Sequence, residues 1–361
     1  MVFKNCVVIV RPTEECNLRC YYCYSNKSSK KRFMNIRTLE NLIKKVLSFY
    51  KEVTFLWHGG EAMLMGIDFF NEILELQRKY GKNKKIINEI QTNGTLINEE
   101  WGKFFKENKF YVGVSIDGPK EINDRIRIYK DGSGSFDDIL RGINILKKYK
   151  VETAGICVLG RHNISKIEDV YNFYKKIGIS LNINPFIGSG RGKLFEQMLQ
   201  ITPEEYGYAM IKLFNLWFQD PSVKIFDFYK IIKSFFIGDN NICCFSGRCS
   251  KEYISICPNG DVYPCGRWAG YTRFKMGNIN TNTMEEIITS KISQKLTQRI
   301  LKLRECINCK WVEICNGGCP HTSYIYTGSI YGKDFYCRGR KILFEYMYNV
   351  VSSYLEKCRS K

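Results

Sequence analysis

The chain has 361 residues, of which 44% are hydrophobic and 25% charged. This composition is typical of a globular protein and excludes a disordered chain, and the length favours two domains or one large domain with an appendage. No apolar run is long enough to span a membrane, and the segment from Met1 to Val10 holds no signal peptide, so we expect a cytoplasmic protein with no membrane partner. Lys and Arg outnumber Asp and Glu by 55 to 36, a formal net charge of +19, and there are 16 cysteines. Because the cytoplasm keeps thiols reduced, the regular spacing of the cysteines indicates metal and not disulfides.

Strand-like and helix-like segments alternate from residue 5 to about residue 187. The predicted strands are 6–10, 53–57, 86–91, 111–116, 153–159 and 181–186. The predicted helices are 38–50, 69–80, 98–106, 136–149 and 166–177. Six strands joined by crossover helices predict a parallel α/β sheet.

The sequence changes character after residue 186. Residues 187–194 are predicted to be a loop, and Thr202, Pro203 and Glu205 form a capping box that starts a helix ending near residue 218. Residues 241–340 hold ten of the sixteen cysteines together with many turns, so we expect bound metal to stabilise this segment. A last helix, about 340–357, has an apolar stripe and is expected to pack on the body.

Three cysteines follow the first predicted strand. Cys16, Cys20 and Cys23 are separated by three and two residues, in the run Cys-Asn-Leu-Arg-Cys-Tyr-Tyr-Cys. Thiolates at this spacing can bind three irons of a cubane cluster and leave the fourth iron open to another ligand. The alternatives are a zinc loop and unconnected thiols.

This motif, with an aromatic residue before the last cysteine, is similar to the motif of the radical SAM superfamily. The resemblance implies a partial (β/α)6 TIM-like barrel with a [4Fe-4S] cluster whose open iron binds S-adenosyl-L-methionine. One-electron reduction then produces a 5′-deoxyadenosyl radical, which abstracts hydrogen from the substrate. An electron donor such as flavodoxin or ferredoxin is therefore an expected partner.

Two further segments resemble cofactor-binding motifs of the same superfamily. His58, Gly59, Gly60 and Glu61 end the second predicted strand and are similar to the Gly-Gly-Glu motif that binds the methionine ammonium. His58 is either a ligand contact or a packed aromatic residue. Ser115 and Arg127 match a serine and an arginine that contact the cofactor in sulfatase maturases and related peptide-modifying enzymes. The alternatives here are an ordinary turn and a surface salt bridge.

The second group of cysteines is similar to the SPASM domain of radical SAM peptide maturases. The resemblance implies two auxiliary [4Fe-4S] clusters, which makes three clusters in the protein. One would be bound by Cys243 (or Cys244), Cys249, Cys265 and Cys319, and the other by Cys306, Cys309, Cys315 and Cys337. Cys243 is preferred to Cys244 because five residues then precede Cys249, and two zinc sites are the alternative. The implied domains are a radical SAM core (1–235), a SPASM domain (236–340) and a C-terminal helix (341–361).

The expected activity is a radical SAM oxidoreductase that modifies a peptide or protein. Sulfatase maturases carry an aspartate, their proposed general base, directly after the cysteine that matches Cys265, but this chain has Gly266 there, followed by Arg267. Because glycine cannot accept a proton, we expect a ribosomal-peptide maturase that forms a thioether or carbon–carbon crosslink or an epimer. A sulfatase maturase that forms formylglycine is the alternative, with Asp261 or a tyrosine as its base.

The net charge bears on the partner. Eleven ligating cysteinates and three oxidised clusters lower it to roughly +14. A basic surface, with a local run of Lys27, Lys30, Lys31 and Arg32, favours an acidic peptide, although solubility alone would also explain it. A nucleic-acid-modifying enzyme and a non-enzymatic iron–sulfur carrier are minor alternatives, and a nucleic-acid partner is not expected because no RNA-binding module is recognisable.

Overall fold

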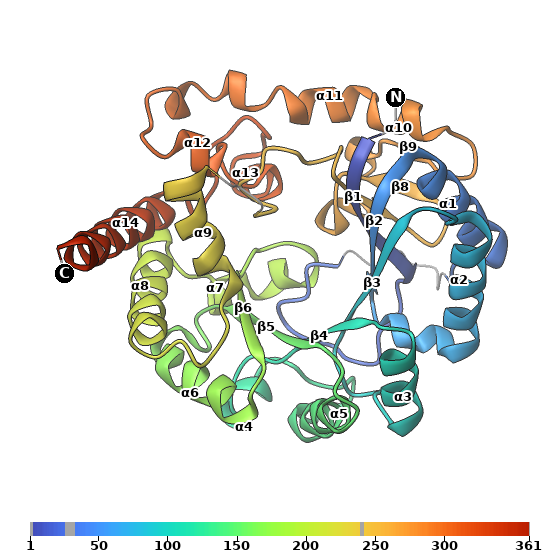
Figure 1. Ribbon diagram of the computed structural model, residues 1–361, viewed down its shortest axis with the longest axis horizontal. Helices are drawn as coiled ribbons and strands as arrows, with labels where there is room; N and C mark the ends of the chain where they lie inside the picture. Colours follow the sequence, from blue (N-terminus) through green and yellow to red (C-terminus); the bar gives the residue numbers. More distant parts are fainter. Residues whose placement is uncertain (1–2, 26–32, 239–241, 361) are drawn as a thin grey trace.

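The computed structural model describes residues 3–25, 33–238 and 242–360. Its parallel strands are β1 (Phe3–Thr13), β2 (Tyr50–Gly59), β3 (Lys85–Thr92), β4 (Tyr111–Ser115), β5 (Thr153–Leu159) and β6 (Ser180–Pro185). Neighbouring strands pair in the order β6-β5-β4-β3-β2-β1. Figure 1 shows these strands as an arc with helices outside it. The prediction of a partial (β/α)6 barrel is therefore confirmed.

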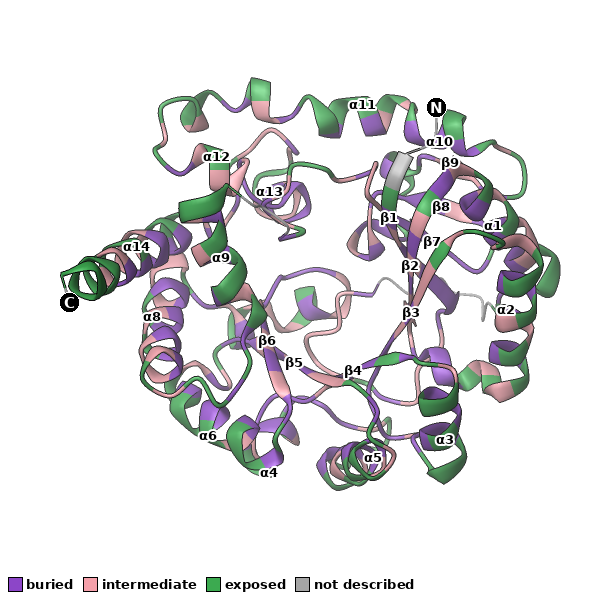
Figure 2. Cartoon of the chain, viewed as in Figure 1, coloured by how far each residue is buried: buried purple, intermediate pink, exposed green. Residues whose placement is uncertain are grey.

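The helices of the barrel cover the outer side of the arc. They are α1 (Ile36–Phe49), α2 (Gly66–Tyr80), α3 (Glu99–Glu107), α4 (Lys120–Asn123), α5 (Phe136–Lys148) and α6 (Ile167–Ile177). Asn35 and Asn98 cap α1 and α3 by accepting hydrogen bonds from the backbone amides of Thr38 and Trp101. Each long crossover helix turns its apolar side inward, as the purple stripes in Figure 2 show.

The cysteine-rich segment extends the same sheet. Strand β7 (Tyr253–Ile256) pairs in parallel with β1, and β8 (Asp261–Tyr263) and β9 (Gly277–Asn278) continue the sheet antiparallel. The helices of this part of the chain are α10 (Met284–Ile288), α11 (Lys291–Thr297), α12 (Val312–Cys315) and α13 (Pro320–Thr327). In Figure 1 this orange segment spans the open side of the arc. The segment is thus joined to the barrel by backbone hydrogen bonds.

The remaining helices either lie between β6 and the cysteine-rich segment or end the chain. They are α7 (Glu196–Leu199), α8 (Pro203–Gln219), α9 (Phe226–Ile237) and the last helix, α14 (Cys337–Arg359). The predicted capping box of α8 is present, and residues 190–199, partly expected as loop, form short helical turns. Helix α14 packs on α8 where Gly207 meets Gly339; a Cβ on Gly339 would lie 1.9 Å from the Pro203 carbonyl oxygen.

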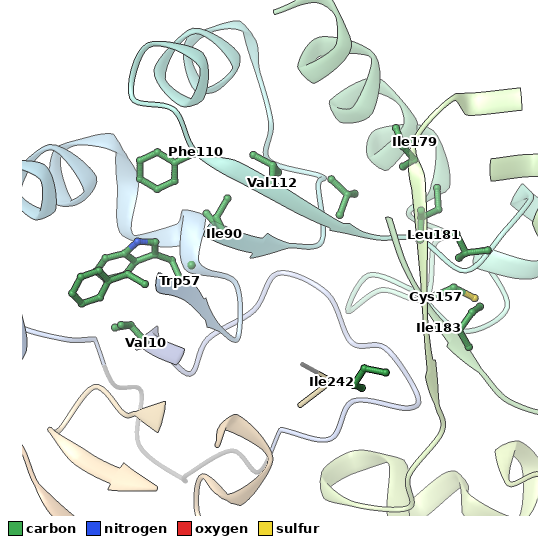
Figure 3. Close-up of a cluster of buried hydrophobic side chains, with 14 of the residues drawn as sticks. Val10, Trp57, Ile90, Phe110, Val112, Cys157, Ile179, Leu181, Ile183 and Ile242 are labelled. Carbon is green, nitrogen blue, oxygen red and sulfur yellow. The ribbon is translucent and has the colours of Figure 1, made fainter. Parts of the chain in front are cut away.

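One continuous core joins the barrel and its extension. It includes Val10, Trp57, Ile90, Val112 and Leu181, which Figure 3 labels, and Trp57 packs on Phe70 of the crossover helix α2. The same core continues to Ile242 at the start of the cysteine-rich segment. The predicted basic run at Lys27, Lys30, Lys31 and Arg32 lies outside the described residues. Within the described ranges, no helix is both long enough and apolar enough to cross a membrane.

Candidate active site

A cavity of about 240 Å³ opens at the carboxyl ends of the parallel strands. This is the edge where α/β barrels place their reactive groups. The predicted site residues that line it are Cys16, Cys20, Cys23, His58, Gly59, Gly60, Ser115 and Arg127. They come from the ends of β1, β2 and β4 and from the loop after β4, so the fold brings together residues that are more than 100 positions apart.

The three cysteines lie on a loop that is fixed by the backbone. The amides of Arg19 and Tyr21 donate to the carbonyls of Ile128 and Ile126, at 2.7 and 3.1 Å. Burial raises the pKa of the Cys16 thiol to about 12, with Glu61, Cys20 and Cys23 contributing further, and burial raises the pKa of Cys20 to about 11. The thiols of Cys16 and Cys20 are therefore protonated at neutral pH, and a metal cluster must displace those two protons when it binds.

The two glycines of the Gly-Gly-Glu segment are required by the neighbouring loop. A Cβ on Gly60 would lie 2.0 Å from the Glu15 carbonyl oxygen, and Gly59 has a φ of +111° with the Thr13 carbonyl oxygen 2.4 Å from its missing Cβ. The loop that carries Cys16 thus packs directly on this turn. The glycines serve this close packing as well as leaving backbone exposed to the cavity.

Glu61 is buried beneath that cavity. Its carboxylate accepts hydrogen bonds from the backbone amides of Met63 and Asn93 (3.2 and 2.8 Å) and from the Thr92 hydroxyl (2.8 Å). Burial raises the pKa of this carboxyl, and the three hydrogen bonds oppose that effect. The side chain that was predicted to meet an ammonium thus also fixes the end of β3.

Ser115 and Arg127 face the cavity from two segments. The Ser115 hydroxyl accepts a hydrogen bond from Gln91 Nε2 at 2.9 Å. Arg127 is buried, donates to the Tyr22 hydroxyl at 2.6 Å, and its Nε has no hydrogen-bond partner among the described residues. An unpaired buried donor fits an anionic or polar ligand.

Residues near Gly266 complete the cavity, and sequence reasoning did not identify them. Arg11 Nη1 donates to the Gly266 carbonyl at 3.1 Å, and Nη2 donates to the Ser25 hydroxyl at 2.8 Å. Of the residues around Gly266, it is Tyr24, Ser25 and Arg267 that line the cavity itself. Asp261, considered above as a base, is absent from the lining and pairs with Lys275.

The remaining predicted ligands gather in two places. A second cavity is lined by Cys306, Cys309, Cys315 and Cys337. Elsewhere, burial raises the pKa of the Cys249 thiol, and Cys319, Cys265 and Cys244 raise it further. Cys243 interacts electrostatically with the same group, so the choice between Cys243 and Cys244 stays a prediction.

The thiol groups fit cubane clusters by their number and grouping. Among the described residues, no three His, Cys, Asp or Glu side chains converge as ligands of a single metal ion would. The cysteines of a cubane bind different irons, so their sulfur atoms stand farther apart around a shared space. The cysteines therefore match three cubane clusters by number: one set of three thiols lies in the barrel, and two sets of four lie in the cysteine-rich segment.

Comparison with known proteins defines the class. Residues 10–174 match the radical SAM superfamily, and residues 242–320 match SPASM, an iron–sulfur cluster-binding domain. Together with the barrel and its cysteine-lined cavity, these matches define a radical SAM enzyme with a SPASM domain. The predicted cofactor classes, S-adenosyl-L-methionine and iron–sulfur clusters, are confirmed at this level.

The relatives narrow the family. The cysteine-type anaerobic sulfatase-maturating enzyme of Clostridium novyi is 34% identical over 95% of both chains. The serine-type enzyme of Bacteroides thetaiotaomicron is 32% identical over 95% of this chain and 90% of its own. A solved structure of native anSMEcpe with bound AdoMet and the Cp18Cys peptide matches with a TM-score of 0.86 at 32% identity, covering 97% of this chain and 99% of that one. The chain belongs to the family of the anaerobic sulfatase-maturating enzymes.

This finding corrects the expected function. The prediction of a crosslinking or epimerising peptide maturase, which depended on Gly266, is wrong, and the alternative is favoured. Streptococcus suis SuiB bound to precursor peptide SuiA matches with a TM-score of 0.69 but only 15% identity, over 93% of this chain and 76% of that one, so it shares the fold alone. The absence of one side chain at position 266 was weaker evidence about the reaction than similarity along 95% of the chain.

Proposed function

We propose that this enzyme matures sulfatases by oxidising one of their cysteine or serine side chains to formylglycine. The observation that carries the proposal is 34% identity, over 95% of both chains, to a cysteine-type sulfatase-maturating enzyme. The likeness to anSMEcpe with a bound peptide supports a peptide segment as the substrate. We expect cysteine to be the preferred side chain, because the 34% identical relative is of the cysteine type.

We assign the cofactor sites on the same basis. Cys16, Cys20 and Cys23 would hold the cluster that binds S-adenosyl-L-methionine, and Gly59, Gly60, Ser115 and Arg127 would bind that cofactor. The eight further cysteines named above would hold two auxiliary clusters. When bound, the radical cluster and its cofactor supply the 5′-deoxyadenosyl radical that removes hydrogen. The domain division at residues 235 and 340 belongs to this proposal.

The residues of the chain have three tasks in this reaction. Arg127, held by Tyr22, would orient the cofactor, and the buried strand ends would keep water from the radical. Arg267 lines the cavity and places Nη1 4.0 Å from Cys319 Sγ, so it stands between the substrate site and a predicted auxiliary cluster. Its positive charge would favour a reduced cluster there, which suits an electron acceptor.

The partners and location follow from charge and thiol chemistry. The net charge of +19 supports an acidic peptide segment, and the radical chemistry requires an electron donor such as flavodoxin or ferredoxin. The cysteines of the described ranges form no disulfide, and reduced thiols are what cluster assembly needs, so we propose a reducing, cytoplasmic location.

Anaerobic turnover of sulfatase peptides tests the proposal. The reconstituted enzyme, with dithionite and S-adenosyl-L-methionine, is incubated with matched peptides that carry Cys, Ser or Ala at the modified position. Mass spectrometry should show formylglycine from the Cys peptide and no change in the Ala peptide. Release of 5′-deoxyadenosine with no formylglycine from either the Cys or the Ser peptide would reject the proposal.

A further inference from the structure

Gly266 leaves room for a side chain at the position where the sequence resemblance led us to expect an aspartate. Gly266 is buried, and a Cβ added to it would lie 3.6 Å from the Tyr24 hydroxyl and 3.5 Å from Ile9 Cγ2, both ordinary contact distances. Arg11 holds the backbone of Gly266 in this position. The Tyr24 hydroxyl therefore borders the volume that a side chain at position 266 would enter.

Tyr24 is linked to His58 across the mouth of the barrel. The Tyr24 hydroxyl lies 3.2 Å from His58 Nε2, and the two rings meet edge to face with centroids 6.3 Å apart. His58 ends β2 next to Gly59 and Gly60, and both aromatic residues line the cavity that contains the three N-terminal cysteines. The pair thus stands between the expected cofactor site and Gly266.

The other ring nitrogen of His58, Nδ1, is buried and makes no hydrogen bond within the described part of the chain. If Nε2 carries the ring proton and donates a hydrogen bond to the Tyr24 hydroxyl, Nδ1 has a lone pair that can accept a proton. Burial, with a smaller contribution from Arg11, lowers the pKa of His58 to about 4. The ring is therefore neutral at pH 7 and about as basic as an ordinary aspartate.

We infer that His58, oriented by Tyr24, accepts the proton of the substrate thiol or hydroxyl in place of a carboxylate at position 266. The inference rests on the proposed function. It also assigns His58 to the substrate, whereas the sequence analysis considered it as a cofactor contact or a packed aromatic residue.

The step balances with the expected cofactors. The substrate cysteine loses a hydrogen atom from Cβ, a proton from sulfur and one electron, and a C=S double bond forms. The hydrogen atom passes to the 5′-deoxyadenosyl radical, the proton to His58, and the electron to an oxidised auxiliary [4Fe-4S] cluster. Water then replaces sulfur, which leaves as hydrogen sulfide, and formylglycine remains.

The decisive variants remove the proposed base at position 58 and then supply a carboxylate at position 266. His58→Gln keeps a polar side chain beside Tyr24 but cannot take up a proton at neutral pH. The ratio of formylglycine to 5′-deoxyadenosine should fall by about 10²–10⁴-fold, because cofactor cleavage needs no base at the substrate. Iron content and equilibrium binding of S-adenosyl-L-methionine should match the wild type. His58→Gln with Gly266→Asp should recover part of the ratio, and His58→Gln with Gly266→Ala, the matched control, should not.

Each other outcome has a defined meaning. An unchanged product ratio in His58→Gln, or a loss of cofactor binding that matches the loss of product, would overturn the role of His58 while the wild type still forms formylglycine. Tyr24→Phe provides a second test, because removing the hydroxyl should lower the same ratio without weakening cofactor binding; an unaltered ratio there also contradicts the inference. Absence of formylglycine from the wild-type reaction would instead reject the proposed function, and with it this role.

Discussion

The Glu61 carboxylate accepts three hydrogen bonds from the protein, two of them from the backbone amides of Met63, in the turn after β2, and Asn93, directly after β3. The Gly-Gly-Glu motif indicated from sequence that this residue belongs to the site, but not that its side chain fixes a neighbouring strand. The reason is physical: the donors at Thr92 and Asn93 are 31 and 32 residues away, and no local pattern shows that β2 and β3 are adjacent. Residue identity was predictable here, and hydrogen-bond partners were not.

Glu61→Ala should weaken the binding of S-adenosyl-L-methionine. The substitution leaves the amide of Asn93 without its acceptor, which costs roughly 1–3 kcal/mol for a buried donor and disturbs the loop that lines the cavity. Equilibrium binding to the reconstituted enzyme measures the change. Glu99→Ala, which removes an exposed ion pair with Lys148, is the control and should bind the cofactor as the wild type does. Equal affinity in both variants would contradict the role assigned to Glu61.

At the scale of elements, the packing of the cysteine loop on the end of β2 explains the two glycines. The pattern of apolar residues predicted the six strands and their crossover helices closely. Hydrophobic residues recur with a period of two in strands and 3.6 in helices, and this period can be found in each segment alone. It gave no sign that β7 pairs with β1, since Val7 and Tyr253 are far apart in the chain and the pairing depends on tertiary contact. The approach of Gly266 to the Tyr24 hydroxyl is likewise a tertiary contact between distant segments and was hidden for the same reason.

Gly60→Ala should remove the radical cluster selectively. Its new methyl group would meet the Glu15 carbonyl oxygen at 2.0 Å, so the loop that carries Cys16 must move. We expect a loss of about four irons, with about eight retained by the auxiliary sites. Gly266→Ala adds a methyl group with only ordinary contacts and should keep the full iron content. Full iron content in Gly60→Ala would show that the close approach is not needed for assembly.

Single substitutions resolve the ligand choice beside α9. Cys243→Ala should lower the iron content by about four and Cys244→Ala should not, if Cys243 binds the first auxiliary cluster. Iron analysis and electron paramagnetic resonance of the reduced proteins give the answer. The reverse pattern would assign the ligand to Cys244, which packs against the main core.

For the whole molecule, the proposed reaction needs three iron–sulfur clusters: one that cleaves the cofactor and two auxiliary clusters, of which one accepts an electron. The resemblance to SPASM domains implied the ligands of the auxiliary clusters, but only the fold shows that Cys306, Cys309, Cys315 and Cys337 line a cavity separate from the main one. Function was less predictable than fold, because a single position, Gly266, suggested a different reaction from the one that the family performs. If His58 on β2 supplies the base, the residue at position 266 gives no sign of it.

Replacing Cys16, Cys20 and Cys23 together by Ala should remove about four of about twelve irons and abolish 5′-deoxyadenosine release. Replacing Cys306, Cys309, Cys315 and Cys337 by Ala should remove about four others while some uncoupled cofactor cleavage remains, because the radical site is separate. Iron analysis and chromatography of the nucleoside products test both. Equal deoxyadenosine release from the wild type and the first variant would refute the assigned radical site.

The central claim is tested most directly by following a hydrogen atom from substrate to cofactor. A sulfatase peptide whose target cysteine carries deuterium on Cβ is turned over anaerobically by the wild-type enzyme, and both products are analysed by mass spectrometry. The account predicts formylglycine in the peptide and deuterium in the 5′-deoxyadenosine formed with it. An unmodified cysteine with unlabelled 5′-deoxyadenosine, or a two-hydrogen loss found only in an unrelated cysteine-rich peptide, would contradict it.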